Sequence, residues 1–263
     1  MQRREFLSAS LATSALALAL EATAQPAANT REYYQMRRYQ MRTGPQTSIT
    51  QSYFADALIP ALSRLGLGPI GAFEAVIGSE APAYYLLIPA NSAETLAQLH
   101  LRLANDAAFL KAAEAFWNAP ASAPAFDRIE TSLLQAFSGW PRLTPPPASA
   151  TKGKRIFQMR TYESPSEQAH IRKVEMFNNG EYECFKAAGF HPVFFGDTLI
   201  GSRMPCLTYM LSLTSFDEYN AHWDAFRNHP DWKKLSANPR YSYEPIVSNI
   251  TNLLLSPLAA SQL

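Results

Sequence analysis

The sequence has few of the residues with which proteins build metal centres, phosphate sites and nucleophilic triads. It contains two cysteines and five histidines, with no Cys-x-x-Cys and no His-x-x-x-His pair. It also lacks Gly-x-Gly-x-x-Gly, a Walker loop and Gly-x-Ser-x-Gly. These absences exclude the common signatures of zinc, dinucleotide, nucleotide-phosphate and serine-hydrolase sites. We therefore expect no metal site and no evident cofactor.

The chain also has almost no net charge and no long apolar stretch. The formal net charge is +1, without a long run of like charges, which argues against nucleic acid as a partner. One short apolar run, residues 8–20, is not long enough for a membrane-spanning helix. Apolar residues make up 47% of the chain, which is ample for a core.

The N-terminus has the pattern of a targeting segment. Arg3-Arg4-Glu5-Phe6-Leu7 precedes the apolar run, and small residues lead to a cleavage point before Gln25. This pattern predicts a Tat-type signal peptide at residues 1–24, with an ordinary Sec signal as the alternative. We therefore expect the protein to be periplasmic or secreted, with no membrane contact after the signal is cleaved.

The chain repeats itself at a constant offset. Gln35-Met36-Arg37-Arg38-Tyr39 returns as Gln158-Met159-Arg160-Thr161-Tyr162, 123 residues later. Other residues recur at the same offset: Phe54 and Phe177, Gly66 and Gly189, Pro69 and Pro192, and Asn105 and Asn228. A period this long predicts two copies of a small domain. We place them at residues 30–137 and 154–256, joined by a Pro-rich linker at 138–153 and followed by a loose tail.

Each copy reads strand, helix, strand, strand, helix, strand. Period-two and helical patterns place the strands at 33–41, 70–77, 83–88 and 126–134, and again at 156–163, 193–200, 207–213 and 245–254. Pro60 and Gly180 predict a break in the first helix of each copy. This order is the ferredoxin-like βαββαβ unit, an α+β fold whose sheet keeps one bare face. Two tandem units would cover those faces by closing an α+β barrel within one chain.

Three stretches resemble the NIPSNAP family of the dimeric α+β barrel group: the opening strands already quoted, residues 195–210, and residues 219–235. The last contains Asn228-His229-Pro230-Asp231-Trp232, where the first copy has Ala107-Ala108-Phe109 in place of Pro230-Asp231-Trp232. The resemblance implies the barrel fold and favours the second copy as the site-bearing half. Kinship to monooxygenases and haem-handling barrels is an analogy of fold.

The opening strands supply the main candidate site. Alternation is interpreted as turning Met36 and Met159 toward the helices. Six polar side chains would then line the lumen: Gln35, Arg37, Tyr39, Gln158, Arg160 and Tyr162. They would bind a small organic ligand or form a buried polar network that fixes the pairing of the sheets. Tyr209, Glu74 and Asp197 also belong to this ligand-binding set.

Acids and histidines supply further candidates. Glu74 and Asp197 occupy equivalent positions in otherwise apolar strands, so each is interpreted as an ion-pair partner of an arginine or as a catalytic carboxylate. Arg160, Tyr162 and Asp197 form the weak catalytic set. His191 lies at the mouth of a strand and joins the ligand-binding set. A haem ligand among His191, His222 and His229 is weighed against ordinary core or surface histidines.

The function expected from the sequence is binding of a small organic molecule in the barrel lumen. The alternatives are a cofactor-light enzyme of monooxygenase or isomerase type, a haem-binding protein and a protein-interaction module. The outer faces of the barrel can still associate, so a homo-oligomer stays among the expectations. Cys184 and Cys206 form a disulfide, which export permits, or are two small buried hydrophobes.

Overall fold

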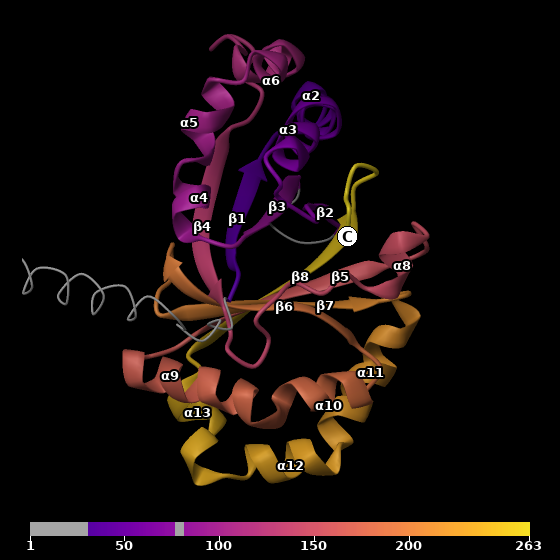
Figure 1. Cartoon of the computed structure of the whole chain (residues 1–263). Helices are drawn as coiled ribbons and strands as arrows, with labels where there is room; N and C mark the ends of the chain where they lie inside the picture. Colours follow the sequence, from indigo (N-terminus) through magenta and orange to yellow (C-terminus); the bar gives the residue numbers. More distant parts are fainter. Residues whose placement is uncertain (1–30, 77–81) are drawn as a thin grey trace, which may run out of the picture. The chain divides into compact units, whose positions relative to one another are not determined.

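The computed structural model describes residues 31–76 and 82–263. The predicted signal peptide, residues 1–24, lies outside the described residues. Residues 31–263 form one unit of structure, in which Figure 1 shows strands between two groups of helices. Across the described segments, no helix combines the length and apolar character needed to cross a bilayer.

The order strand, helix, strand, strand, helix, strand occurs twice. The first unit contains β1 (Tyr33–Gln40), β2 (Gly71–Ala75), β3 (Ala83–Ala90) and β4 (Arg128–Ala136). The second unit contains β5 (Ile156–Glu163), β6 (His191–Ile200), β7 (Cys206–Leu213) and β8 (Asn249–Pro257). The predicted strands agree closely except for β8, which begins at residue 249 rather than 245. The reason is a short helix, α13 (Tyr243–Ile246), which takes up the start of the predicted strand.

The eight strands close into one antiparallel barrel in the order β1-β3-β2-β8-β5-β7-β6-β4. Two seams join the units. Phe73 of β2 lies opposite Pro257 of β8, and Ala136 of β4 lies opposite Gly196 of β6. The seams pair backbone groups that would otherwise be left open at the edges of each sheet. The α+β barrel within one chain is therefore confirmed.

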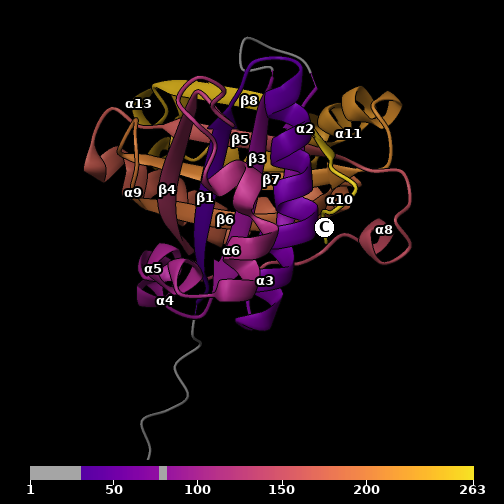
Figure 2. The ribbon, with the colours of Figure 1, turned by 90° about the horizontal axis from the view of Figure 1, so that it is seen from above.

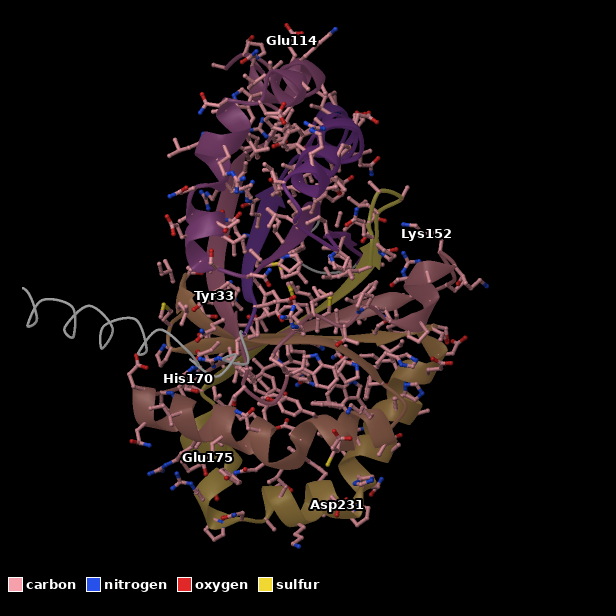
Figure 3. All side chains as sticks on the ribbon, in the orientation of Figure 1. Tyr33, Glu114, Lys152, His170, Glu175 and Asp231 are labelled. Atoms are coloured by element: carbon pink, nitrogen blue, oxygen red, sulfur yellow. The ribbon has the colours of Figure 1, made fainter. Side chains whose placement is uncertain are left out.

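Helices cover the outside of the barrel on two sides. The first unit supplies α2 (Pro45–Ser52), α3 (Ile59–Arg64), α4 (Ala93–Ala97), α5 (Leu99–Ala104), α6 (Ala107–Ala112) and α7 (Glu114–Trp117). The second supplies α9 (Glu167–Met176), α10 (Tyr182–Ala187), α11 (Asp217–Asn228), α12 (Pro230–Ser236) and α13. Figure 2 shows α2 and α3 running beside β1 and β3. Glu114 and Asp231, labelled in Figure 3, lie in the two opposite helix groups.

The first helix of each unit is interrupted at the same place. A π-helical segment, Tyr53–Leu58, separates α2 from α3 just before Pro60. A second π-helical segment, Phe177–Glu181, separates α9 from α10, and its Gly180 has φ of 127°. A positive φ of this size suits glycine, which has no Cβ. The predicted breaks at Pro60 and Gly180 are confirmed.

The C-terminal tail and the linker are more ordered than the sequence predicts. Leu263 is fully buried, and the backbone of Ala72 donates to the Ser261 hydroxyl at 3.0 Å. Gln262 and Ile70 exchange two more hydrogen bonds, of 2.7 and 2.9 Å. The prediction of a loose tail after residue 256 is therefore wrong. The tail is held because it satisfies backbone groups of β2 and of the residue just before it. Within the linker, residues 147–150 form helix α8 (Pro147–Ala150).

An exposed ion pair joins α9 to the loop after α12. The Arg240 guanidinium donates to both carboxylate oxygens of Glu175, at 2.7 and 2.6 Å. The Tyr241 hydroxyl donates to the same carboxylate at 2.7 Å. These hydrogen bonds, first that of Arg240 and then that of Tyr241, lower the pKa of Glu175 to about 2. Figure 3 shows Glu175 on the side of α9 away from the strands.

The lowered pKa of Glu175 gives a pH-dependent contribution to stability. Since the folded-state pKa lies below the usual value, the contribution is complete above about pH 4.5 and is lost as the pH falls toward about 2. We expect Glu175→Gln to lower the urea midpoint at pH 6 and to match the wild type near pH 2. Urea unfolding at several pH values checks this. The same gap between the two proteins at pH 6 and near pH 2 would contradict it.

Candidate functional site

The barrel lumen is packed with apolar side chains over most of its length. Its core contains residues from both units, among them Tyr34, Phe73, Phe157, Phe194 and Leu263. Tyr34 and Phe194 are in ring contact at 5.1 Å, and Phe73 and Phe157 at 4.8 Å. An eight-stranded barrel is just wide enough for side chains to fill it. This part of the lumen therefore has a structural role.

One end of the lumen is different, because it holds a cavity of about 120 Å³. It lies where β1 and β5 end and where the β6–β7 hairpin turns. Apolar side chains, including Met36, Met159 and Leu253, form part of its wall. Hydroxyl groups form another part: Ser132, Thr161, Thr198, Ser202, Thr208 and Thr251. We call this cavity the lumen mouth.

Contacts between strands and with the β6–β7 turn hold the polar wall of the lumen mouth. The hydroxyls of Thr161 and Thr208 lie 2.8 Å apart, and Arg203 donates to the Thr251 hydroxyl at 2.8 Å. Arg38 forms an ion pair with Glu130 at 2.8 Å. Hydroxyls both donate and accept hydrogen bonds, so this wall can meet either kind of polar group on a ligand.

The predicted lumen-facing set is wrong in orientation. Met36 and Met159 lie in the lumen core, whereas Tyr39 and Tyr162 belong to the cores beneath the helices. Gln35 likewise donates to a carbonyl of α4. Alternation along a strand defines two faces but does not say which face meets the helices. Packing decides it, because a narrow lumen selects apolar side chains while long polar ones extend along the helix layer.

Beneath the helices of the second unit, Gln158 organises a polar array. Its amide oxygen accepts from the indole of Trp223 at 2.9 Å. Its amide nitrogen donates to Asn252 at 2.7 Å and to the Tyr219 hydroxyl at 3.2 Å. Gln158 is completely buried, so these bonds satisfy its carboxamide. The sequence predicts a buried polar network as the alternative to a ligand site. Such a network is present around Gln158, but it lies between the sheet and the helices rather than between the two sheets.

Arg160 lies beside this array and stacks on aromatic rings. Its guanidinium carbon is 4.5 Å from the Trp223 ring centre and 5.2 Å from that of Tyr162. Burial lowers its pKa, but the nearby oxygens of Tyr209 and Tyr162 more than offset this, so the pKa is raised. Its buried Nε has no hydrogen-bond partner among the described residues. Arg160 is therefore a charged group held mainly by aromatic faces.

A fully buried ion pair lies next to these tyrosines. Lys173 donates to Glu181 at 2.7 Å, and the two side chains are 3% and 2% exposed. Burial lowers the pKa of Lys173 and raises that of Glu181, while their mutual attraction opposes both shifts. Lys173 also lies 4.5 Å from the ring centre of Phe177. The pair is part of the core of the second unit.

The weak catalytic set does not come together around an acid. Asp197 bonds His170 instead, with Oδ1 and Nε2 2.7 Å apart, and Figure 3 shows His170 between α9 and the strands. The Tyr162 hydroxyl bonds that of Tyr209 at 2.9 Å. Burial raises the pKa of Tyr209 well above its usual range, so its hydroxyl stays protonated. The expected partner of Asp197 is an arginine, but its partner in the structure is a histidine instead.

The remaining candidates are dispersed. His191 is exposed at the start of β6. Glu74 is partly exposed on β2, opposite Tyr84 and on the outer face of the barrel. Arg37 donates through Nε to Gln35 at 2.8 Å. None of these three residues lines the lumen mouth.

The structure also bears on metals, haem and the cysteines. Within residues 31–76 and 82–263, no group of three His, Cys, Asp or Glu side chains could hold a metal ion. The lumen mouth has no histidine in its wall and is far smaller than pockets for drug-sized ligands, so it does not fit haem. Cys184 and Cys206 are buried and unpaired. Burial raises the pKa of Cys184 to about 11, which keeps it a thiol.

The fold defines a class: α+β barrels built from ferredoxin-like units. Residues 157–262 match the NIPSNAP family model, which confirms the resemblance for the second unit. No curated protein matches the chain.

Solved structures share the fold at low identity. A candidate monooxygenase from Fusobacterium nucleatum superposes with a TM-score of 0.57 at 10% identity, covering 87% of this chain and 93% of that one. A candidate monooxygenase from Lactobacillus acidophilus gives 0.58 at 8% identity, with 88% and 97% covered. An anthrone oxidase-like protein gives 0.51 at 11% identity, with 86% and 91% covered. Identities this low show a shared fold alone.

Sequence reasoning missed the hydroxyl wall and the buried ion pair. The hydroxyl wall follows from continuing the alternation of β5 from Met159 to Thr161, once Met159 is known to face the lumen. The ion pair had its own signal: Glu181 lies four residues after Phe177 and four before Phe185, on the apolar face of the helix. A charge at such a position needs a buried partner.

Proposed function

We propose that the protein binds a small polar organic molecule at the lumen mouth. The observation that carries the proposal is a cavity of about 120 Å³ whose wall combines apolar side chains with hydroxyl groups. Ligand sites combine apolar surface with a few polar groups in this way. A dry cavity of about 150 Å³ holds benzene, so the lumen mouth suits a ligand of about six non-hydrogen atoms.

The proposal includes the protein's organisation and location. Both units are copies of one NIPSNAP-type domain, supported by the 123-residue offset in sequence and by π-helical segments at equivalent places. The chain is exported through residues 1–24 and acts outside the cytoplasm, with a small organic molecule rather than nucleic acid as its partner. Enzymatic use of the bound molecule stays a prediction from the sequence.

Two adjacent residues of β4 make a matched test. Ser132 lines the lumen mouth, whereas Thr131 lies on the other face of the strand. We expect Ser132→Phe to fill the cavity and Thr131→Phe to leave it open, because successive side chains of a strand point to opposite faces. Native mass spectrometry of protein exported through its own signal, and saturation-transfer NMR with cyclopentanone and propane-1,2-diol, measure occupancy.

The expected result is a bound mass, or probe binding, in the wild type and in Thr131→Phe. Ser132→Phe should lose it by about tenfold or more. Circular dichroism confirms that both variants fold. A bare protein mass together with no probe binding in the wild type overturns the proposal. Equal binding by Ser132→Phe overturns it as well.

A further inference from the structure

The first unit has a recess between its sheet and its helices that is separate from the lumen mouth. Its volume is about 290 Å³. Its walls come from β1, α4, α5 and β4: Gln35, Arg37, Leu96, Ala97, His100, Ile129 and Thr131. None of these residues lines the lumen mouth. We call it the first-unit recess.

The recess exists because the two units differ at two helix positions. In the second unit Tyr219 and Trp223 occupy the equivalent place, and both bond the carboxamide of Gln158. In the first unit the corresponding residues are Leu96 and His100. The strand partners correspond as well, since Arg37 lies opposite Thr131 and Arg160 lies opposite Asn252. Aromatic side chains thus fill in one unit the space that stays open in the other.

The His100 ring is held to one side of the recess. It stacks on Trp117, with ring centres 5.0 Å apart and an angle of 15° between the planes. Leu96 is buried and offers its carbonyl to the Gln35 amide at 3.4 Å. His100 therefore does not cover Arg37 as Trp223 covers Arg160 through a cation–π contact at 4.5 Å.

Arg37 gives the recess a positive charge without a local acid. Its Nε donates to Gln35 at 2.8 Å, which fixes the guanidinium in the recess. Among the described residues, no carboxylate forms an ion pair with Arg37. Neighbouring acids are engaged elsewhere: Glu130 with Arg38, and Asp127 with Arg42. The two terminal nitrogens of Arg37 make no hydrogen bond within the described part of the chain, which leaves a fork-shaped donor.

We propose that the first-unit recess binds the carboxylate of a small organic acid. The two terminal nitrogens of Arg37 match the two oxygens of a carboxylate, the geometry that makes such pairs strong. His100 and Thr131 add polar groups to the lining, while Leu96, Ala97 and Ile129 offer apolar surface to the body of the ligand. A volume of about 290 Å³ lies near the lower end of ordinary ligand pockets.

Benzoate and its neutral isostere benzamide are the probes, measured by isothermal titration calorimetry on the full mature chain. We expect benzoate to bind and benzamide to bind at least about tenfold more weakly, because a charged hydrogen bond to Arg37 is lost. Arg37→Met should weaken benzoate binding by about tenfold or more for the same reason. Arg102→Met, which removes an exposed arginine outside the recess, should leave it unchanged.

A second variant places the aromatic side chains of the second unit at the equivalent positions of the first unit. Leu96→Tyr combined with His100→Trp should abolish benzoate binding by filling the recess. Thr131→Phe should weaken benzoate binding and Ser132→Phe should not, which separates this site from the lumen mouth. Equal binding of benzoate and benzamide, or full binding by Arg37→Met or the double variant with native circular dichroism, overturns the proposal. Loss on Ser132→Phe alone would assign benzoate to the lumen mouth and would also overturn it.

Discussion

Glu181→Ala is expected to destabilise the protein by about 3–5 kcal/mol, because it leaves the ammonium of Lys173 buried without a counter-charge. Lys173 and Glu181 are both nearly inaccessible and 2.7 Å apart. With Glu181 absent, the pKa of Lys173 falls further, since burial already lowers it. A lysine pKa that is lower in the folded than in the unfolded state gives stability that rises with pH. The loss should therefore shrink between pH 6 and pH 10. Urea unfolding at these pH values measures both effects.

The first unit offers the control for this prediction. At the same offset it carries Thr50 and Leu58 in place of Lys173 and Glu181, so the fold does not require the pair. Lys173→Met combined with Glu181→Leu should restore most of the stability, because it removes both charges and keeps the volume. A double variant as unstable as Glu181→Ala would show that the loss comes from packing. A loss in Glu181→Ala that does not change with pH would contradict the assignment to an unpaired lysine.

Leu263→Ala is expected to cost about 2–5 kcal/mol, the range for truncating a fully buried leucine that leaves a cavity. Leu263 is inaccessible and packs in the lumen core with side chains of both units. Its backbone oxygen accepts two hydrogen bonds from the Arg155 guanidinium, at 3.0 and 2.7 Å. The side chain thus closes the end of the lumen opposite the lumen mouth. Chemical unfolding with an unchanged m value measures the loss.

Ala259, which is exposed in the same tail, supplies the comparison. Ala259→Ser should stay within about 0.5 kcal/mol of the wild type, as surface substitutions usually do. If Leu263→Ala and Ala259→Ser were equally stable, the tail would contribute nothing to the barrel core, and the sequence-based expectation of a loose tail would stand.

Much of the fold was predictable because local patterns and the internal offset agree. The alternation in residues 156–163 gave β5 with the observed bounds. Gly180 marked the interruption between α9 and α10 because a positive φ there suits glycine. The barrel followed from two sheets that each lacked a cover on one face. These are properties of short segments and of their order along the chain.

The candidate site was less predictable. Met36 and Arg37 alternate correctly, but the sequence assigned them to the wrong faces. In a closed barrel both faces of the sheet are buried, one by helices and one by the opposite strands, so apolar residues mark neither face alone. The partner of Asp197 was also out of reach, since His170 lies 27 residues earlier on a helix.

By itself the sequence determined the two βαββαβ units, their breaks at Pro60 and Gly180, and the closed α+β barrel. Tertiary structure alone decided which side chains enter the lumen, that Leu263 completes its core, and that Leu96 and His100 leave a recess where Tyr219 and Trp223 fill one. The physical reason is the range of the interactions. Periodicity and turn chemistry act within a segment, whereas the facing of a strand and the filling of a cavity depend on side chains that only folding brings together.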